Sequence, residues 1–147
     1  MNKRRTTFLL VEDDDIHAHL VMRSLENARV RNEIFRVADG AEAIAYLRGE
    51  DQYADRQLPD VVLLDLKLPK VDGHDVLAII KEDEQLKFIP VVIMTTSNDE
   101  ADRAKAYRHH ANSYVVKPID FEKFRQLVTE LCLYWSVWNE PPDGDYQ

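Results

Sequence analysis

A run of four apolar residues, Val61–Leu64, leads directly into the carboxylate of Asp65 and is bracketed by Pro59 and Pro69. The run is too short for an ordinary helix and shows no polar alternation, so we interpret it as a strand buried on both faces, as in parallel sheets. Such a strand cannot bury a charge cheaply, so Asp65 should lie where the strand ends. Ligands of open α/β sheets bind at the carboxyl ends of the strands, which makes Asp65 the first candidate functional residue.

Short apolar segments of this kind alternate with helical stretches along the whole chain. Strand–helix alternation predicts a doubly wound parallel sheet with right-handed crossovers and helices on both faces. The fourth helical stretch is highly charged and poorly amphipathic, so we expect an exposed element that could be mobile. We expect one domain over residues 1–140 and a loose tail over 141–147. The predicted strands are 6–11, 33–37, 61–64, 91–95 and 113–116, and the predicted helices are 16–28, 41–48, 74–81, 99–109 and 121–138.

Bulk properties exclude several classes of protein. The net charge of −8 argues against a general binder of nucleic acid or of anionic membranes, which needs a basic face. The single cysteine, Cys132, excludes an internal disulfide framework. No apolar run approaches the ~20 residues that span a bilayer, and the N-terminus does not resemble a signal peptide. We therefore expect a cytoplasmic protein with no nucleic-acid or membrane partner.

Polar side chains follow four of the five predicted strands. Glu12 and Asp13 follow the first strand, Asp65 the third and Lys117 the fifth, while Thr95 ends the fourth. Carboxyl ends of parallel strands share one edge of the sheet, so these groups should meet. Crowded carboxylates repel each other unless a cation joins them, and Mg²⁺ prefers oxygen ligands. Acids, a metal, an ammonium and a hydroxyl suit attack of an aspartate on phosphorus.

The same residues resemble the receiver domain of two-component response regulators. The likeness covers residues 6–138 and implies a flavodoxin-like (CheY-like) (βα)₅ fold with strand order 2-1-3-4-5. The matching elements are Glu12-Asp13, Leu64-Asp65, Leu68-Pro69, Asp72-Gly73, Thr95 and Lys117-Pro118. The combination of these sequence elements is more specific to the family than any one of them alone.

This resemblance assigns a metal site to the acids. Asp65 is then the phosphoacceptor. Glu12 and Asp13 are expected to hold Mg²⁺, Asp13 more directly, together with Asp65 and the backbone carbonyl of Lys67. The expected chemistry is confined to phosphorylation and dephosphorylation of the protein itself, so we do not expect an enzyme acting on a separate substrate.

The resemblance also implies a switch. Thr95 is expected to bind the phosphoryl group and move inward, and Tyr114 to swing inward behind it. Lys117 is expected to pair with Asp65 or with its phosphoryl oxygen, and the Lys117–Pro118 peptide to be cis. Since no output domain follows in this sequence, we expect a stand-alone regulator that acts through protein contacts.

A resemblance to one subgroup of this family indicates which protein donates the phosphoryl group. Three segments are similar to single-domain regulators of bacterial and cyanobacterial phytochromes: Thr95–Ser97, His110–Tyr114 and Tyr134-Trp135. The commoner pattern has glycine where His110 stands, at a turn that could require a positive φ. A sensor histidine kinase, here a bacteriophytochrome, is thus the expected phosphoryl donor. A homodimer through the fourth helix, fifth strand and fifth helix is a further expectation.

Each of these residues also has a more ordinary structural explanation. Asp65 alone could be a solvated loop acid, the acids at 12–15 partners of a helix dipole, Thr95 an ordinary strand residue and Lys117 a surface lysine. A Mg²⁺-dependent aspartate phosphatase usually needs a second aspartate two residues after the first, where this chain has Lys67. A receiver-like adaptor that takes no phosphate is a third alternative. The remaining histidines, His17, His19, His109 and His110, we interpret as solvated or capping residues.

Overall fold

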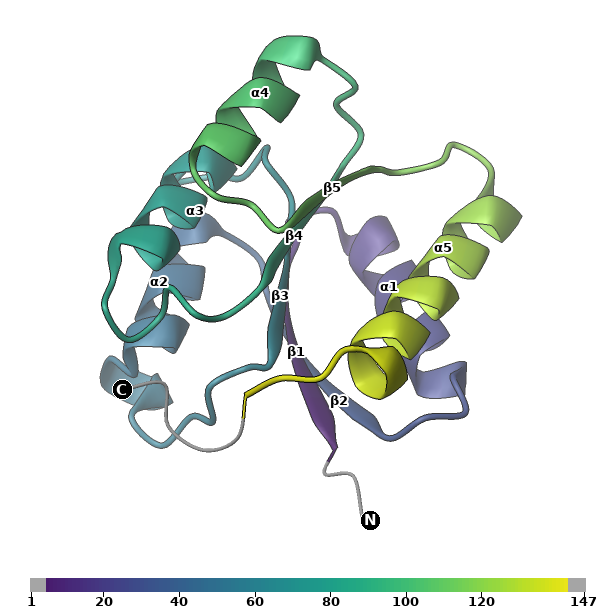
Figure 1. The fold of residues 1–147 in the computed structure, drawn as a ribbon, viewed down its shortest axis with the longest axis horizontal. Coiled ribbons are helices and arrows are strands. Elements are labelled where there is room, and N and C mark those ends of the chain that lie inside the picture. The colour runs from purple at the N-terminus through teal and green to yellow at the C-terminus, as the bar shows by residue number, and fades with distance from the viewer. Residues whose placement is uncertain (1–4, 143–147) are drawn as a thin grey trace.

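The computed structural model describes residues 5–142, and a five-stranded sheet forms its centre (Figure 1). The strand order is β2-β1-β3-β4-β5, and all four strand pairs are parallel. This order confirms the predicted flavodoxin-like topology. The strands are β1 (Thr6–Val11), β2 (Asn32–Val37), β3 (Val61–Leu64), β4 (Val91–Thr95) and β5 (Ser113–Val116).

Helices cover both faces of this sheet. Figure 1 shows α2, α3 and α4 on one side and α1 and α5 on the other. A short 3₁₀ helix, η1, lies in the polar segment 49–59, and a π-helical turn, η2, continues α5 to Trp138. Among the described residues, no helix has the length and apolar character needed to cross a membrane. The bounds are α1 (Asp15–Asn27), α2 (Gly40–Arg48), η1 (Asp51–Tyr53), α3 (Gly73–Glu82), α4 (Glu100–Arg108), α5 (Phe121–Leu133) and η2 (Tyr134–Trp138).

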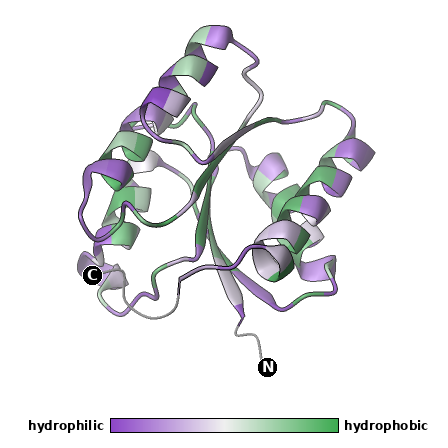
Figure 2. Ribbon diagram, viewed as in Figure 1, coloured by the Kyte–Doolittle hydropathy of each residue, from purple (hydrophilic) through white to green (hydrophobic). Residues whose placement is uncertain are grey.

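The central strand β3 separates two apolar cores. Val62 and Leu64 pack into the cluster beneath α2 and α3, whereas Val61 and Leu63 pack into the cluster beneath α1 and α5. All four side chains are at most 2% exposed, which confirms that this strand is buried on both faces. Figure 2 shows the hydrophobic colouring concentrated in the strands and on the inward faces of the helices. Burial of one such side chain stabilises the fold by roughly 1.5–3 kcal/mol.

Aspartates start all five α-helices of the described chain. Each N-cap side chain accepts a backbone N–H from the first turn, which satisfies a donor that has no partner within the helix. The first helix therefore begins at Asp15 rather than at Ile16, because Asp14 caps it. The caps are Asp14, Asp39, Asp72, Asp99 and Asp120.

The helix α4 is anchored weakly by apolar packing. Within α4, all of which the structure describes, Ala106 alone is buried. This agrees with the exposed, charged helix expected from the sequence. The turn that follows α4 places His110 at φ 69°, in the left-handed region where we expected the commoner glycine to be needed. Polar contacts must therefore contribute much of what positions α4 on the sheet.

Candidate functional site

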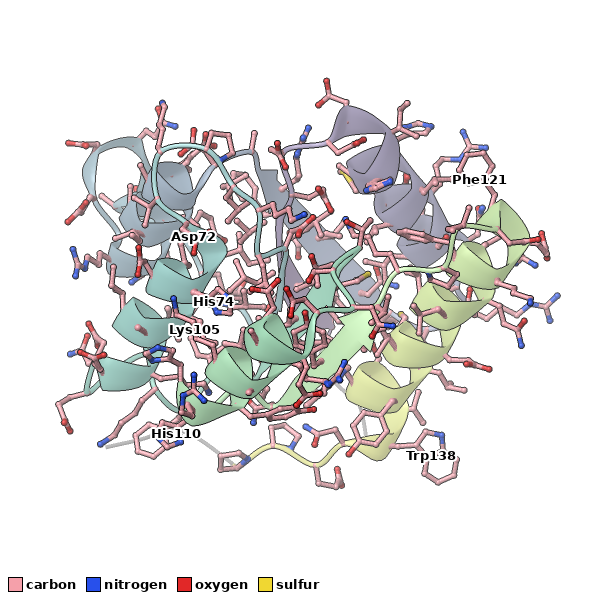
Figure 3. The ribbon with its side chains drawn as sticks, turned by 90° about the horizontal axis from the view of Figure 1, so that it is seen from above. Asp72, His74, Lys105, His110, Phe121 and Trp138 are labelled. Carbon is pink, nitrogen blue, oxygen red and sulfur yellow. The ribbon has the colours of Figure 1, made fainter. Side chains whose placement is uncertain are left out.

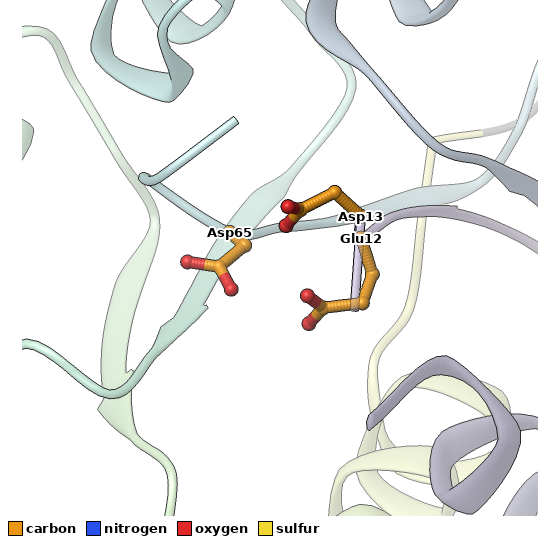
Figure 4. Close-up of side chains that lie close together, drawn as sticks. All are labelled: Glu12, Asp13 and Asp65. Carbon is orange, nitrogen blue, oxygen red and sulfur yellow. The ribbon is translucent and has the colours of Figure 1, made fainter. Parts of the chain in front are cut away.

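Two adjacent strands bring three carboxylates together. β1 and β3 pair in parallel with Val11 level with Leu64, so the chain leaves both strands at the same height. Glu12, Asp13 and Asp65 follow these strand ends, and each offers a carboxylate oxygen that lies within 4.8 Å of the others (Figure 4). Glu12 and Asp65 are buried, whereas Asp13 is exposed. The predicted acid cluster is thus present, with one member open to solvent.

Lys117 connects this carboxylate cluster to β5, the strand at one edge of the sheet. It follows β5, and its backbone N–H donates to the carbonyl of Thr95 at 2.7 Å. Its ammonium donates to Oε1 of Glu12 at 2.5 Å and to Oδ2 of Asp65 at 2.9 Å. Only 4% of Lys117 is exposed, so both ion pairs are shielded from water. The lysine is therefore a fixed counter-charge for two of the three carboxylates.

One ammonium does not neutralise this pocket. Burial raises the pKa of Glu12 from 4.5 to about 7; Lys117 opposes this rise, and the neighbouring Asp65 adds to it. A buried carboxylate whose pKa is raised is short of positive charge in its surroundings. Oxygen donors that are clustered, partly exposed and short of positive charge are the ligands that hard divalent cations take. The residues present thus fit a divalent metal ion.

Arg36 and Asp14 hold the loop that carries the acids. The guanidinium of Arg36 donates from Nε and Nη2 to the backbone carbonyl of Glu12, at 2.9 and 2.7 Å, and it pairs with Asp15 at 3.0 Å. The backbone N–H of Asp14 donates to Oε2 of Glu12 at 3.2 Å. Sequence reasoning missed Arg36, because an arginine in the half-polar strand β2 gives no signal of a role at the site. The loop is held from both sides before any cation enters.

The proposed switch residues lie on β4 and β5. Thr95 ends β4 and is fully buried, next to the strand that carries Asp65. Tyr114 is half-buried against the core, and its hydroxyl donates to the backbone carbonyl of Ser97 at 3.0 Å. Burial raises the pKa of the Tyr114 hydroxyl. The structure therefore ties Tyr114 to the loop after Thr95, and the predicted inward movements of both residues stay predictions.

A hydrogen-bonded chain, Ser97–Asp102–His74, leads from this loop to α4 and α3. The hydroxyl of Ser97 donates to Oδ2 of Asp102 at 2.6 Å, and Oδ1 of Asp102 lies 3.3 Å from Nε2 of His74. The Ser97 hydrogen bond, followed by that of His74, lowers the pKa of Asp102. His74 is buried in the first turn of α3 (Figure 3). We did not anticipate Asp102 or His74, because residues of two separate helices make this contact.

The segment after Asp65 approaches the site through its backbone. The N–H of Lys67 donates to Oδ1 of Asp65 at 3.3 Å, while the lysine side chain is exposed. Gly73 begins α3 so close to this segment that an added Cβ would lie 2.4 Å from the carbonyl oxygen of Asp65. The Asp72-Gly73 element is therefore required sterically: only glycine lets α3 start against the strand end.

Two expectations are corrected by the structure. The Lys117–Pro118 peptide is trans rather than cis. The trans form is the intrinsically preferred one by about 0.5–1 kcal/mol, and with it the Lys117 ammonium still reaches both carboxylates. His17, which we interpreted as solvated or capping, instead places Nδ1 2.9 Å from the ammonium of Lys117. Its ring reaches the pocket because it lies on the inner side of the first turn of α1, a placement that needs the packed helix.

Comparisons with known proteins agree with this site. The model of the response regulator receiver domain family matches residues 8–129. The probable methanogenesis regulatory protein FilR2 of Methanothrix harundinacea is 48% identical over 134 residues, which cover 91% of this chain and 86% of that protein.

Solved structures give the same result. The phosphorylated cyanobacterial phytochrome response regulator RcpA superposes with a TM-score of 0.92 at 41% identity, covering 95% of this chain and 100% of that one. The Mn²⁺-bound response regulator Rcp1 gives a TM-score of 0.90 at 36% identity, covering 93% and 99%. The family match, the strand order and the acid–lysine pocket together show that this chain belongs to the response regulator receiver domain family.

Proposed function

We propose that this receiver domain takes a phosphoryl group onto Asp65 and uses it to change its protein contacts. The observation that carries the proposal is the position of Lys117, whose ammonium bonds both Asp65 and the Glu12 carboxylate beside it. An isolated surface acid has no such buried counter-charge. The arrangement prepares positive charge where a phosphoryl group on Asp65 would place new negative oxygens.

The transfer is a displacement at phosphorus. A carboxylate oxygen of Asp65 attacks the phosphorus of a phosphohistidine, the P–N bond breaks, and an acyl phosphate forms while the imidazole departs. Lys117 can turn one N–H from the Asp65 oxygen toward a phosphoryl oxygen without leaving Glu12. Thr95, which ends the neighbouring strand, is proposed to close on the same phosphoryl group, with Tyr114 following.

A divalent cation completes this pocket, and we propose that it is Mg²⁺. Glu12, Asp13, Asp65 and the backbone carbonyl of Lys67 are its proposed ligands, and the clustered oxygens of the three carboxylates support the assignment. Bound there, the ion would neutralise charge on phosphoryl oxygens. Asp13 is the most exposed of the three acids and so the one best placed to receive an ion from solvent.

The phosphoryl donor is proposed to be a sensor histidine kinase, specifically a phytochrome. The phytochrome regulator RcpA supports this link through its match over nearly the whole chain. FilR2, a relative of higher identity, carries a name that refers to methanogenesis instead. If autophosphorylated bacteriophytochrome kinases fail to transfer their phosphoryl group to Asp65, the phytochrome part is refuted and the receiver chemistry still stands.

The added charge of about −1.5 to −2 acts by favouring one of two local arrangements. We propose that the altered surface is formed by α4, β5 and α5, through which the domain pairs with a second copy. Large apolar side chains exposed there support this surface, among them Phe121 at 66% and Trp138 at 70%, near the two ends of the α5–η2 segment (Figure 3). We further propose that residues 1–140 act as one domain, in the cytoplasm.

Labelling with a small phosphoryl donor tests the central claim. Wild-type protein, incubated with Mg²⁺ and acetyl phosphate, should gain one acid-stable, hydroxylamine-sensitive acyl phosphate, and Asp65→Asn should gain none. Asp60→Asn is a matched control, because Asp60 precedes the same strand at its opposite end. Retention of the label in Asp65→Asn would reject the assignment.

A further inference from the structure

We propose that His17 is a positioning residue for phosphoryl transfer, because its ring nitrogen is a third hydrogen-bond partner of the Lys117 ammonium besides the two carboxylates. This inference rests on the proposed function of Asp65 and goes beyond it. The observation is the 2.9 Å contact between Nδ1 of His17 and Nζ of Lys117. A histidine was no part of the site derived from the sequence.

The hydrogen-bonding capacity of an ammonium group shows which atom donates. A lysine ammonium has three N–H donors and no acceptor, so His17 Nδ1 must accept. The other two partners of Lys117 are Oε1 of Glu12 and Oδ2 of Asp65. The three contacts account for all three N–H groups. This contact requires Nδ1 of His17 to be the acceptor, with the ring proton on Nε2.

Burial makes this third contact matter. The Lys117 side chain is 1% exposed, so water cannot easily replace a lost acceptor. A buried N–H⁺ left without a partner is costly, and the long, flexible stem of lysine allows the ammonium to seek another position. His17 itself is held by packing, since its ring lies 5.8 Å from the ring of Phe124 on α5. The backbone of His17 is also fixed, because its N–H donates to the N-cap Asp14.

The three contacts have different roles during transfer. The Lys117 N–H that donates to Asp65 must turn toward the incoming phosphoryl group, because the Asp65 carboxylate becomes an acyl phosphate. The contacts to Glu12 and His17 can persist, and they define where the ammonium stays. Glu12 is a proposed metal ligand, so its geometry changes with the ion, whereas His17 lies outside the carboxylate cluster. Among the described partners of the Lys117 ammonium, His17 is thus the anchor that neither the metal nor the phosphoryl group uses.

Substitution of His17 separates this role from general packing. His17→Ala removes the acceptor, while His17→Asn restores a neutral oxygen acceptor at the distance of Nδ1. With acetyl phosphate and Mg²⁺, we expect His17→Ala to slow labelling of Asp65 on the order of tenfold, short of the hundredfold that a 1 Å misplacement can cause. His17→Asn should recover most of the rate. His19→Ala is the matched control, because His19 is exposed on the same helix and should leave the rate unchanged.

Two further measurements make the result decisive. Mg²⁺ affinity, followed by fluorescence or calorimetry, should be nearly the same in wild type and His17→Ala, which also shows that the variant folds. A long-range ¹H–¹⁵N spectrum at pH 8 should show the His17 ring with an unprotonated Nδ1 and a protonated Nε2. Equal labelling rates for wild type and His17→Ala, or a proton on Nδ1, would overturn the inference. Failure of the wild-type protein to accept any label is a different outcome, since it removes the proposed function and the positioning role with it.

Discussion

The charge on Glu12 opposes folding of the metal-free domain, and this can be measured. The pKa of Glu12 is raised to about 7 in the folded protein, mainly by burial, against 4.5 for an ordinary glutamate. One pKa unit corresponds to about 1.36 kcal/mol, so ionising Glu12 costs the fold on the order of 3 kcal/mol. The side chain is buried, so solvent screening does not remove this cost.

The sign of the pH dependence follows from linkage. Between pH 4.5 and about 7 the folded state keeps a proton on Glu12 that the unfolded chain has lost. The stability contributed by this group is therefore complete below pH 4.5 and disappears as the pH rises through 7. Glu12→Gln removes the titration. The free energy of unfolding of wild type minus that of Glu12→Gln should fall by about 3 kcal/mol between pH 4.5 and 8.5.

Urea unfolding in EDTA, monitored by circular dichroism, measures this difference. Other titrating groups are common to both proteins and largely cancel. Exposed Glu26 of α1 supplies a matched control, because Glu26→Gln should follow the wild-type profile in parallel. Adding Mg²⁺ at pH 8 should stabilise wild type more than Glu12→Gln, since a metal ligand must be ionised. Parallel pH profiles for wild type and Glu12→Gln would show that burial does not penalise this carboxylate.

Three further predictions concern the frame of the site. Gly73→Ala should destabilise the domain by roughly 1–3 kcal/mol in urea unfolding, because its Cβ meets the Asp65 carbonyl; a neutral result would contradict that close approach. Asp102→Ala should accelerate amide exchange throughout α4, since it cuts the Ser97–Asp102–His74 chain, and unchanged exchange would show that packing of Ala106 suffices. Trp138→Ala should lower the dimer fraction of beryllofluoride-activated protein in ultracentrifugation, while a purely monomeric wild type would remove the proposed dimer surface.

The strand ends could be predicted because the residues next to each end mark it. An apolar run that stops at a polar residue marks where a covered strand leaves the sheet, which is why Glu12, Asp65 and Lys117 were found without coordinates. The parallel sheet then forces these ends together. The 4.8 Å limit on the spacing of the carboxylate oxygens and the Lys117 contacts confirm that the predicted residues meet.

Contacts between separate helices were not predictable in the same way. The His74–Asp102 pair joins α3 to α4, and Arg36 reaches from β2 to the carbonyl of Glu12. Such contacts depend on how elements are rotated and spaced, which no periodicity records. The trans Lys117–Pro118 peptide is a similar case, because the family resemblance implied one isomer and the packed chain has the other.

The order of apolar and polar residues determined a doubly wound parallel sheet and the bounds of four of its five strands, whereas β2 begins at Asn32, one residue before the predicted start. It also determined the acids, hydroxyl and ammonium that lie at the strand ends along one edge. That information is local, since a few consecutive residues suffice to indicate a buried strand or a helix cap. Tertiary structure alone decided the electrostatics of the pocket: how deeply Glu12 is buried, and that the third N–H of Lys117 points to His17. Desolvation and the direction of a hydrogen bond depend on every element packed around a group, so they exist only once the chain has folded.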